Sequence, residues 1–261
     1  MISIILPTYN ERDCIYDLVE SIENIMEAYE YELLVVDDNS PDGTSDLIRT
    51  KFEGVKHHHL VTRYTNRGLV NSINEGISKS KGNICAWMDT DLSMSPTLIP
   101  MMLKKIEEGG DLVVGSRYIP GGAIKGGNPN EAFSWGKVST ALSRSEDSLL
   151  SAVISKGGNK VIKTILGSQL NDFSSGYFVV RKDILQNPAL IGGIVDYCIQ
   201  FVSAIERNGY QVAEVPMTLI PRRTGKSKTS NSILSILSIA TKCLLTACQL
   251  RFSRGRLSKT R

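Results

Sequence analysis

The stretch LLVVDDNSPDGT, Leu33–Thr44, indicates the class of fold, because four consecutive apolar residues lead directly into an acidic turn. A short apolar run bounded by turn-forming residues is typical of a strand that is buried on both faces of a parallel sheet. The first half of the chain contains four more such runs: Ile2–Leu6, Leu60–Thr62, Ile84–Met88 and Leu112–Val114.

Helical patterns separate these apolar runs. After the first run, apolar residues recur every three or four positions, at Ile15, Leu18, Val19, Ile22 and Ile25. Asn10 is expected to cap this helix, and Thr44 is expected to cap the next one. Alternating strands and helices predict an α/β fold in which a mostly parallel sheet has helices on both faces. In such sheets, ligands bind beyond the carboxyl ends of the strands.

The second half of the chain is less regular. Residues 119–160 are rich in glycine and serine, and we interpret them as a long mobile insertion with a helical stretch around Val138, Ala141 and Leu142. The features expected after it are a helix over Val161–Leu166, the apolar run Phe173–Val180, a helix near Val195–Arg207, a strand near Gln211–Leu219 and the apolar stretch Ile233–Leu250. We therefore expect a catalytic domain over residues 1–230 and a distinct C-terminal segment over residues 231–261.

Composition sets broad limits on what the protein does. The 261 residues include 41% hydrophobic residues, enough for a sizeable core. Five scattered cysteines without a CxxC pair argue against zinc and redox chemistry and indicate reduced thiols. The chain has no GxGxxG after its first strand, no GxxxxGK[ST] and no GxSxG, so a dinucleotide oxidoreductase, a P-loop NTPase and an α/β-hydrolase are not expected. The three histidines His57–His59 do not predict a metal site, because adjacent residues of an extended chain point to alternating faces.

Acidic residues follow two of the expected strands. Asp37 and Asp38 come directly after the second strand, and Asp89 and Asp91 come after the fourth. Carboxylates at these positions suit a hard cation such as Mg²⁺ or Mn²⁺, which readily shares its oxygen ligands with a diphosphate. The plainer alternative for the first cluster is a turn built from good turn formers.

Cationic residues occur at two further positions. Arg117 ends the fifth strand, where its guanidinium is placed to bind phosphate oxygens in a bidentate manner. The segment RRTGKSK, Arg222–Lys228, is a basic loop suited to closing over anionic groups. The alternatives are a surface arginine and a solvated run of charge.

Taken in order, these motifs resemble the family-2 glycosyltransferases of the GT-A fold, and among them the dolichyl-phosphate (polyprenyl-phosphate) mannose synthases. The matching segments are PTYNE (Pro7–Glu11), DDNSPDGT (Asp37–Thr44), NRGL (Asn66–Leu69), MDTDLS (Met88–Ser93), GSRY (Gly115–Tyr118), DFSSGYFVVRKDIL (Asp172–Leu185), GYQVAEVP (Gly209–Pro216) and RRTGKSK. The chain departs from the pattern at Val70, Met94 and Ser95, and it is longer after Gly122, which implies a remodelled acceptor side.

The resemblance implies roles for particular residues. It implies that Asp89 and Asp91 bind the metal, Mg²⁺ or Mn²⁺, together with the donor diphosphate, and that Asp91, Arg117 and Asp172 serve catalysis. The residues expected to hold the donor nucleotide are Pro7, Tyr9, Glu11, Val36 and Asp38, and those expected to contact the donor diphosphate or the acceptor phosphate are Arg117, Arg222 and Lys228.

The implied reaction is inverting transfer of a hexose, mannose from GDP-mannose, to a polyprenyl or dolichyl phosphate. Such an acceptor already carries negative charge near neutral pH and needs no strong base. Asp172 is therefore either a general base for a hydroxyl acceptor or a residue that orients the acceptor site or a cationic side chain. The alternatives are a UDP-sugar-dependent enzyme acting on a polyprenyl phosphate or a saccharide, a catalytically silent nucleotide-sugar-binding membrane subunit, and a nucleotidyltransferase.

The C-terminal segment suggests contact with a membrane. Residues 222–261 carry ten Lys or Arg and no acid, whereas residues 1–221 carry twenty against 27 acids. Lys242 interrupts the last apolar stretch, so we expect an amphipathic helix lying in the membrane interface, with a basic tail that attracts anionic lipid. The expected location is peripheral, on the cytoplasmic face of a membrane, with no nucleic-acid partner. The alternative is a helix that packs on the domain.

Overall fold

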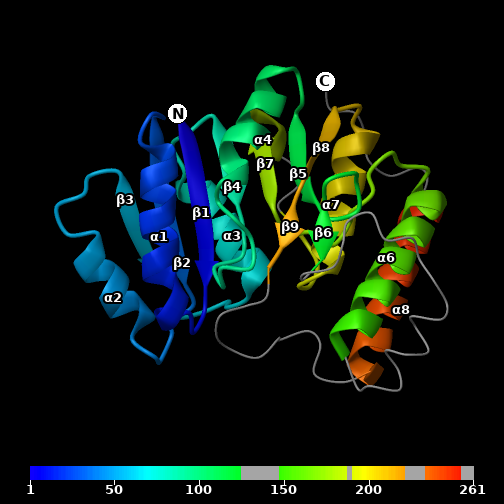
Figure 1. The fold of residues 1–261 in the computed structure, drawn as a ribbon, viewed down its shortest axis with the longest axis horizontal. Coiled ribbons are helices and arrows are strands. Elements are labelled where there is room, and N and C mark those ends of the chain that lie inside the picture. Colours follow the sequence, from blue (N-terminus) through cyan, green and yellow to red (C-terminus); the bar gives the residue numbers. More distant parts are fainter. Residues whose placement is uncertain (125–146, 187–189, 221–232, 254–261) are drawn as a thin grey trace.

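The computed structural model describes residues 1–124, 147–186, 190–220 and 233–253. A seven-stranded sheet in the order β3-β2-β1-β4-β7-β5-β8 forms the centre, and β6 and β9 form a small second sheet (Figure 1). The strands are β1 (Ile2–Thr8), β2 (Tyr31–Asp37), β3 (His58–Thr62), β4 (Ile84–Trp87), β5 (Leu112–Ser116), β6 (Ala123–Ile124), β7 (Phe178–Arg181), β8 (Val212–Pro216) and β9 (Thr218–Leu219). All paired strands of the large sheet are parallel except for β7, which runs antiparallel to both β4 and β5. The predicted mostly parallel sheet is confirmed.

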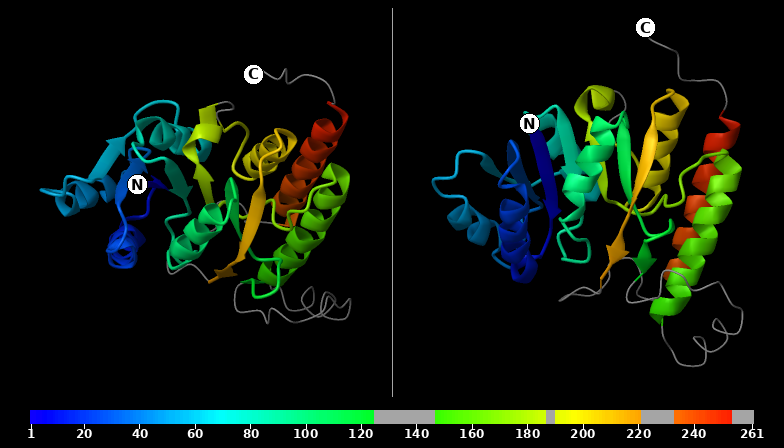
Figure 2. Two further views of the ribbon diagram at one scale, coloured as in Figure 1. Left: turned by 90° about the horizontal axis from the view of Figure 1, so that it is seen from above. Right: turned by 45° about the horizontal axis from the view of Figure 1, so that its top comes forward.

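Helices cover both faces of this sheet. They are α1 (Arg12–Met26), α2 (Thr44–Lys51), α3 (Leu69–Lys79), α4 (Leu98–Glu107), α6 (Asp147–Leu166), the short 3₁₀ helix η1 (Lys182–Gln186), α7 (Asp196–Arg207) and α8 (Ile233–Phe252). Side chains from α1, α2 and α4 pack in one core cluster, and side chains from α3 and α7 pack in the other. The helices α6 and α8 lie side by side beyond α7 (Figure 2).

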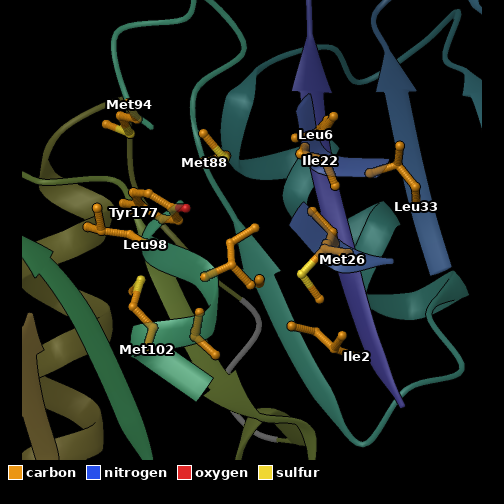
Figure 3. Close-up of a cluster of buried hydrophobic side chains, with 14 of the residues drawn as sticks. Ile2, Leu6, Ile22, Met26, Leu33, Met88, Met94, Leu98, Met102 and Tyr177 are labelled. Carbon is orange, nitrogen blue, oxygen red and sulfur yellow. The ribbon is translucent and has the colours of Figure 1, made fainter. Parts of the chain in front are cut away.

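The side chains of each strand point alternately to the two faces of the sheet, which explains the continuous apolar runs. On β1, Ile4 and Leu6 join the cluster below α1 and α4, whereas Ile5 joins the cluster on the opposite face. Both faces are therefore buried, which favours an unbroken apolar strand over an alternating one. Figure 3 shows side chains of the first cluster, to which β1 contributes Leu6, α1 contributes Ile22 and α4 contributes Leu98. Each fully buried side chain of this size contributes about 1.5–3 kcal/mol to folding.

The structure corrects the interpretation of residues 119–160 at its end, over residues 147–160, which are helical. The expected helix over Val161–Leu166 is the end of a longer helix, α6, which begins at Asp147. Gly157 and Gly158 argue against a helix in the sequence, because each glycine costs about 1 kcal/mol relative to alanine in a helix interior. Packing against α8 offsets that cost. The helical stretch expected around residues 138–142 lies outside the described residues.

The two expected helix caps are wrong in detail. Helix α1 follows Glu11 and has no side-chain cap, while Asn10 adopts a φ of 58° and its N–H donates to Ser40 Oγ at 2.8 Å. Thr44 is the first residue of α2 rather than its cap. Its N–H and hydroxyl both donate to Asp42 Oδ1, at 3.0 Å and 2.6 Å. These polar groups fix the loops at the strand ends instead of capping the helices.

The C-terminal helix α8 packs on α6 and α7, as the alternative interpretation expects. Its buried residues include Ile236, Cys243 and Ala247, whereas Leu245 and Phe252 are exposed. Among the described helices, none is sufficiently long and apolar to cross a bilayer. All five cysteines are free thiols.

His58 and His59 begin β3, whereas His57 lies in the turn before it. His58 is buried against the ring of Phe52, with ring centroids 4.8 Å apart, and His59 is partly exposed beside Glu32. The structure contains no cluster of three potential metal-ligating side chains within the described part of the chain. Burial lowers the pKa of His58 to about 4.

Candidate active site

A cavity of about 420 Å³ lies where β1, β2 and β4 end, at the sheet edge at which ligands of α/β proteins bind. These three strands are neighbours in the sheet, so their carboxyl ends meet at the same place. The lining residues are Pro7, Thr8, Tyr9, Glu11, Asp38, Arg67, Gly68, Leu69, Ser72, Asp89, Thr90, Asp91 and Ile194. Six of the residues expected in the site therefore line one cavity: Pro7, Tyr9, Glu11, Asp38, Asp89 and Asp91.

Asp38 is held rigidly at one end of the cavity. Its Oδ1 accepts hydrogen bonds from Arg63 Nη1 and Ser72 Oγ, both at 2.8 Å, and its Oδ2 accepts the N–H of Gly68 at 2.6 Å. Gly68 has a φ of 126°, in a region that favours glycine, and it precedes the first residue of α3. The amino end of a helix favours a negative charge nearby. The carboxylate is therefore preorganised to face a ligand without moving.

Asp37, the other member of the acidic pair, has a structural role. It is fully buried and accepts hydrogen bonds from Ser40 N at 2.9 Å and from Ser45 Oγ at 2.6 Å. These bonds tie the acidic turn to the start of α2. Asp37 thus fits the turn interpretation of this segment, whereas Asp38 lines the cavity.

Asp89 and Asp91 follow β4 and line the same cavity. Asp91 is almost fully buried, and its Oδ1 accepts the N–H of Ser93 at 2.9 Å. Between the two carboxylates and Ser93, Leu92 adopts a φ of 62°, which costs of order 1–3 kcal/mol for a residue with a side chain. This strained turn directs oxygen donors of the type that Mg²⁺ and Mn²⁺ prefer toward the cavity. Two carboxylates fit a cation that completes its coordination with water and substrate oxygens.

Arg117 and Asp172 form a buried pair. Arg117 Nε donates to Asp172 Oδ2, and Arg117 Nη2 donates to Asp172 Oδ1, both at 2.8 Å. The backbone N–H of Arg117 donates to Oδ2 as well, at 3.0 Å. Asp172 has no exposed surface, and 12% of the Arg117 side chain is exposed. Burial alone would lower the pKa of Arg117, but the adjacent carboxylate of Asp172 raises it above its usual value.

Asn159 of helix α6 hydrogen-bonds to the residues that follow Asp172. Asn159 Oδ1 accepts the N–H of Phe173, and Asn159 Nδ2 donates to Ser174 Oγ at 3.0 Å. Ser174 Oγ in turn accepts a hydrogen bond from Arg117 Nη2 at 2.8 Å. The guanidinium expected to bind phosphate is thus oriented by a carboxylate that follows it by 55 positions in the sequence.

The remaining expected residues lie elsewhere. Val36 is fully buried in the core cluster with Leu34 and is absent from the cavity lining. Arg117 and Asp172 meet each other but do not line the cavity. Arg222 and Lys228 lie outside the described residues.

Sequence reasoning missed several cavity residues, of which Arg67 and Ile194 matter most. Arg67 belongs to the NRGL motif, and its exposed guanidinium has no hydrogen-bond or ion-pair partner within the described part of the chain. An arginine within the NRGL motif, next to the glycine that precedes α3, was the available signal. Ile194 is an apolar residue in a loop, and nothing in the sequence around it indicates a cavity.

Solved structures show the class of fold. The glucosyl-3-phosphoglycerate synthase of Mycobacterium tuberculosis, in complex with Mn²⁺, UDP and glucosyl-3-phosphoglycerate, matches with a TM-score of 0.62 at 18% identity, covering 96% of this chain and 79% of that chain. The same enzyme with Mg²⁺ and UDP also gives a TM-score of 0.62, with the same identity and coverage. The fold is therefore that of the GT-A glycosyltransferases.

The sequence comparisons show the family. The model for glycosyl transferase family 2 matches residues 3–187, and the chain belongs to this family. A dolichol-phosphate mannosyltransferase of Pyrococcus furiosus is 30% identical over 232 residues, which are 87% of this chain and 58% of that protein. A polyprenol monophosphomannose synthase of Mycolicibacterium smegmatis is 30% identical over 238 residues, 88% of this chain and 81% of that protein. The chain thus spans less than two thirds of the Pyrococcus protein, and the resemblance inferred from the motifs is confirmed.

Proposed function

We propose that the protein transfers mannose from GDP-mannose, with inversion, to the phosphate of a polyprenyl or dolichyl phosphate. The single observation that carries this proposal is the cavity that joins the Asp38 end to Asp89 and Asp91. A nucleotide sugar has the matching chemistry, because its base and ribose lie on one side of a diphosphate that a metal ion can bind. The two relatives named for mannosyl transfer to dolichol phosphate and polyprenol phosphate support the choice of sugar and acceptor.

The donor is bound by residues that the fold holds in place. Tyr9 is exposed beside the cavity and offers an aromatic face for the base, while Asp38 offers a fixed acceptor for a base or ribose donor group. Pro7 and Glu11 complete this end. A rigid acceptor costs no reorganisation when the donor binds, which favours affinity.

Asp89 and Asp91 hold Mg²⁺ or Mn²⁺ together with the donor diphosphate. The bound cation supplies charge neutralisation for the nucleoside diphosphate that leaves. Asp91 is oriented by the N–H of Ser93, so its position does not depend on the ligand. Glucosyl-3-phosphoglycerate synthase, which shares the fold, is found with Mn²⁺ or Mg²⁺ and UDP, and this supports a divalent cation here.

Asp172 acts by holding Arg117 rather than as a general base. Both carboxylate oxygens accept charge-assisted hydrogen bonds from Arg117, and the carboxylate is inaccessible to solvent. A base needs a free lone pair that faces the acceptor. A lipid phosphate needs no such base, because its second pKa is about 6 and it is already an anion. The oriented guanidinium of Arg117 then serves the phosphate groups together with Arg222 and Lys228.

The proposed organisation follows from these roles. Residues 1–230 form the catalytic domain, and residues 231–261 associate with the cytoplasmic face of a membrane through the exposed apolar side chains of α8 and the basic tail. Leu245 and Phe252 are among these exposed side chains.

A transfer assay tests the proposal. Membranes supplied with a polyprenyl phosphate, and with Mg²⁺ or Mn²⁺, are incubated with radiolabelled GDP- and UDP-sugars, and the organic-extractable lipid is counted. We expect label from GDP-mannose, lost in Asp91→Ala and retained in Asp46→Ala, which removes an exposed carboxylate on α2. If only a UDP-sugar labels the lipid, the donor is that UDP-sugar and the proposed type of reaction stands. Label in a saccharide would overturn the lipid acceptor, and donor binding without turnover would indicate a catalytically silent subunit.

A further inference from the structure

The segment Leu190–Val195 forms part of the cavity wall without belonging to any motif. Its Ile194 lines the cavity, and the segment leads directly into α7. Tyr197, in the first turn of that helix, lies below the acidic end of the cavity. A Cβ atom on Gly176 would be 3.6 Å from the Tyr197 hydroxyl and 4.0 Å from Asp89 Oδ1. The segment therefore bridges the two ends of the cavity, between α3 and the Asp89 side.

The two ends of this segment are clamped by different helices. At its start, Asn74 of α3 donates from Nδ2 to the carbonyl of Leu190 at 2.8 Å and accepts the N–H of Leu190 at 3.0 Å. At its end, Asp196 Oδ1 accepts the N–H of Gly193 at 3.0 Å. Lys242 of α8 donates to the same oxygen at 2.9 Å. A residue of the C-terminal helix thus meets the carboxylate that fixes the segment.

The two glycines show how closely this ion pair fits the segment. A Cβ on Gly193 would be 2.9 Å from Asp196 Oδ1 and 3.1 Å from Lys242 Nζ. Gly192 has a φ of 111°, and a Cβ there would be 2.9 Å from Asp196 Oδ2. Both distances to Asp196 are shorter than real Cβ contacts allow. The backbone at Gly192 and Gly193 therefore packs closely against the ion pair of Asp196 and Lys242.

Within the described residues, Asp196 is the only ion-pair partner of Lys242. Lys242 is the only charged residue between Ile233 and Leu250. Asp196 is 8% exposed at the side chain, so the carboxylate needs partners, and 61% of the Lys242 side chain remains in solvent. Burial alone would raise the pKa of Asp196, but the hydrogen bond from Lys242 helps to lower it. The pair is thus favourable in this position.

We propose that Lys242 is a positioning residue of the donor cavity, which acts through Asp196 to hold Ile194 in the cavity wall. This inference rests on the proposed use of the cavity for a nucleotide sugar. The C-terminal helix α8 then helps to shape the donor site, in addition to any contact with a membrane.

The test compares four single variants and the double variant Lys242→Met/Ile194→Ala, each in the full chain. Lys242→Met removes the charge, Lys242→Arg keeps it, and Ile194→Ala removes the wall directly. Lys105→Met is the matched control, because Lys105 forms an exposed 2.6 Å pair with Glu108 on α4. The measurements are the Kd of GDP with Mg²⁺, the KM values for donor and acceptor, kcat, and the amide exchange of residues 191–195 in the unliganded protein.

We expect Lys242→Met to raise the Kd of GDP and the donor KM about twofold to fivefold, the range that corresponds to one partly exposed ion pair. The acceptor KM, kcat and thermal midpoint remain near those of the wild type, and Lys242→Arg behaves as the wild type. Because Lys242 acts through Ile194, the double variant is no worse than Ile194→Ala alone. Amide exchange at residues 191–195 becomes faster in Lys242→Met and not in Lys105→Met.

Two results would overturn the inference: unchanged amide exchange in Lys242→Met, or multiplicative effects of Lys242→Met and Ile194→Ala on the Kd. Failure of the wild-type protein to bind GDP has a different meaning. It would count against the proposed donor, and the Kd would then be measured with UDP while the amide exchange decides the role of Lys242.

Discussion

Replacing Asp172 by asparagine tests whether Asp172 holds Arg117 in place or acts as a general base. The substitution keeps the shape of the side chain but removes the charge and places an amide N–H₂ group among the donors of Arg117. Removing one partner of a buried ion pair costs about 3–5 kcal/mol. Both side chains are buried here, so we expect the free energy of unfolding to fall by about that amount. For a chain of this size the thermal midpoint then falls by about 6–20 °C.

The assay is urea denaturation of the purified variant beside a matched control. Asp46→Asn removes the same type of group from the 2.6 Å pair of Asp46 with Arg49, in which both side chains are more than 60% exposed. An exposed pair of this type contributes about 0–1 kcal/mol, so the control retains nearly all of its stability. A loss below about 1 kcal/mol in Asp172→Asn would refute the reasoning from burial.

Kinetics complete the experiment. If Asp172 only orients Arg117, the variant has a lower kcat/KM, but the shape of its pH–rate profile matches that of the wild type. Removal of one limb of the profile would show that Asp172 exchanges protons during turnover, and it would favour a hydroxyl acceptor.

Three further predictions concern single residues. Arg67→Ala weakens GDP binding about twofold to tenfold, because one solvent-exposed hydrogen bond of about 0.5–1.5 kcal/mol is lost; Arg49→Ala on α2 is the control, and equal titration curves for both would contradict the assignment. His58 has a pKa of about 4 in the folded protein, below its usual value, so stability falls as the pH drops from about 6.5 toward 4, by up to about 3 kcal/mol. His58→Gln lacks this contribution, and a wild-type free energy of unfolding that parallels the variant across this pH range would contradict it. Gly176→Ala loses about 1–2 kcal/mol of stability, because Gly176 has a φ of 77°; Gly157→Ala in α6, where a Cβ meets nothing within 4 Å, is neutral or stabilising, and equal melting temperatures for the two variants would argue against backbone strain.

The strands and the cavity carboxylates Asp38, Asp89 and Asp91 could be predicted because they depend on local pattern. Apolar runs such as Ile2–Leu6 mark the buried strands, and acidic residues after two of them mark the ligand edge. The sequence could not show the direction of β7, because an apolar run has no direction and its partners β4 and β5 lie far away in the chain.

Other features depend on contacts between distant residues. The bidentate contact of Arg117 with Asp172 looks from sequence like two independent site residues, and only the fold brings them together. Likewise, the sequence shows Lys242 only as an interruption of an apolar helix, whereas the structure places Asp196 beside it. Helix α6 shows the same limit, because its two glycines suggest a loop unless the packing against α8 is known.

The position of β7 has a consequence for how the protein is made. In the sheet order, β4 and β5 are separated by β7, whose residues Phe178–Arg181 are synthesised more than 60 positions after β5 ends at Ser116. During translation the strands β3-β2-β1-β4 can assemble early, while β5 must wait for the strand that joins it to them. Until then β4 presents an unpaired edge, and such edges promote aggregation. Folding on the ribosome is therefore expected to occur in two stages, with the nascent chain most vulnerable just before Arg181 emerges.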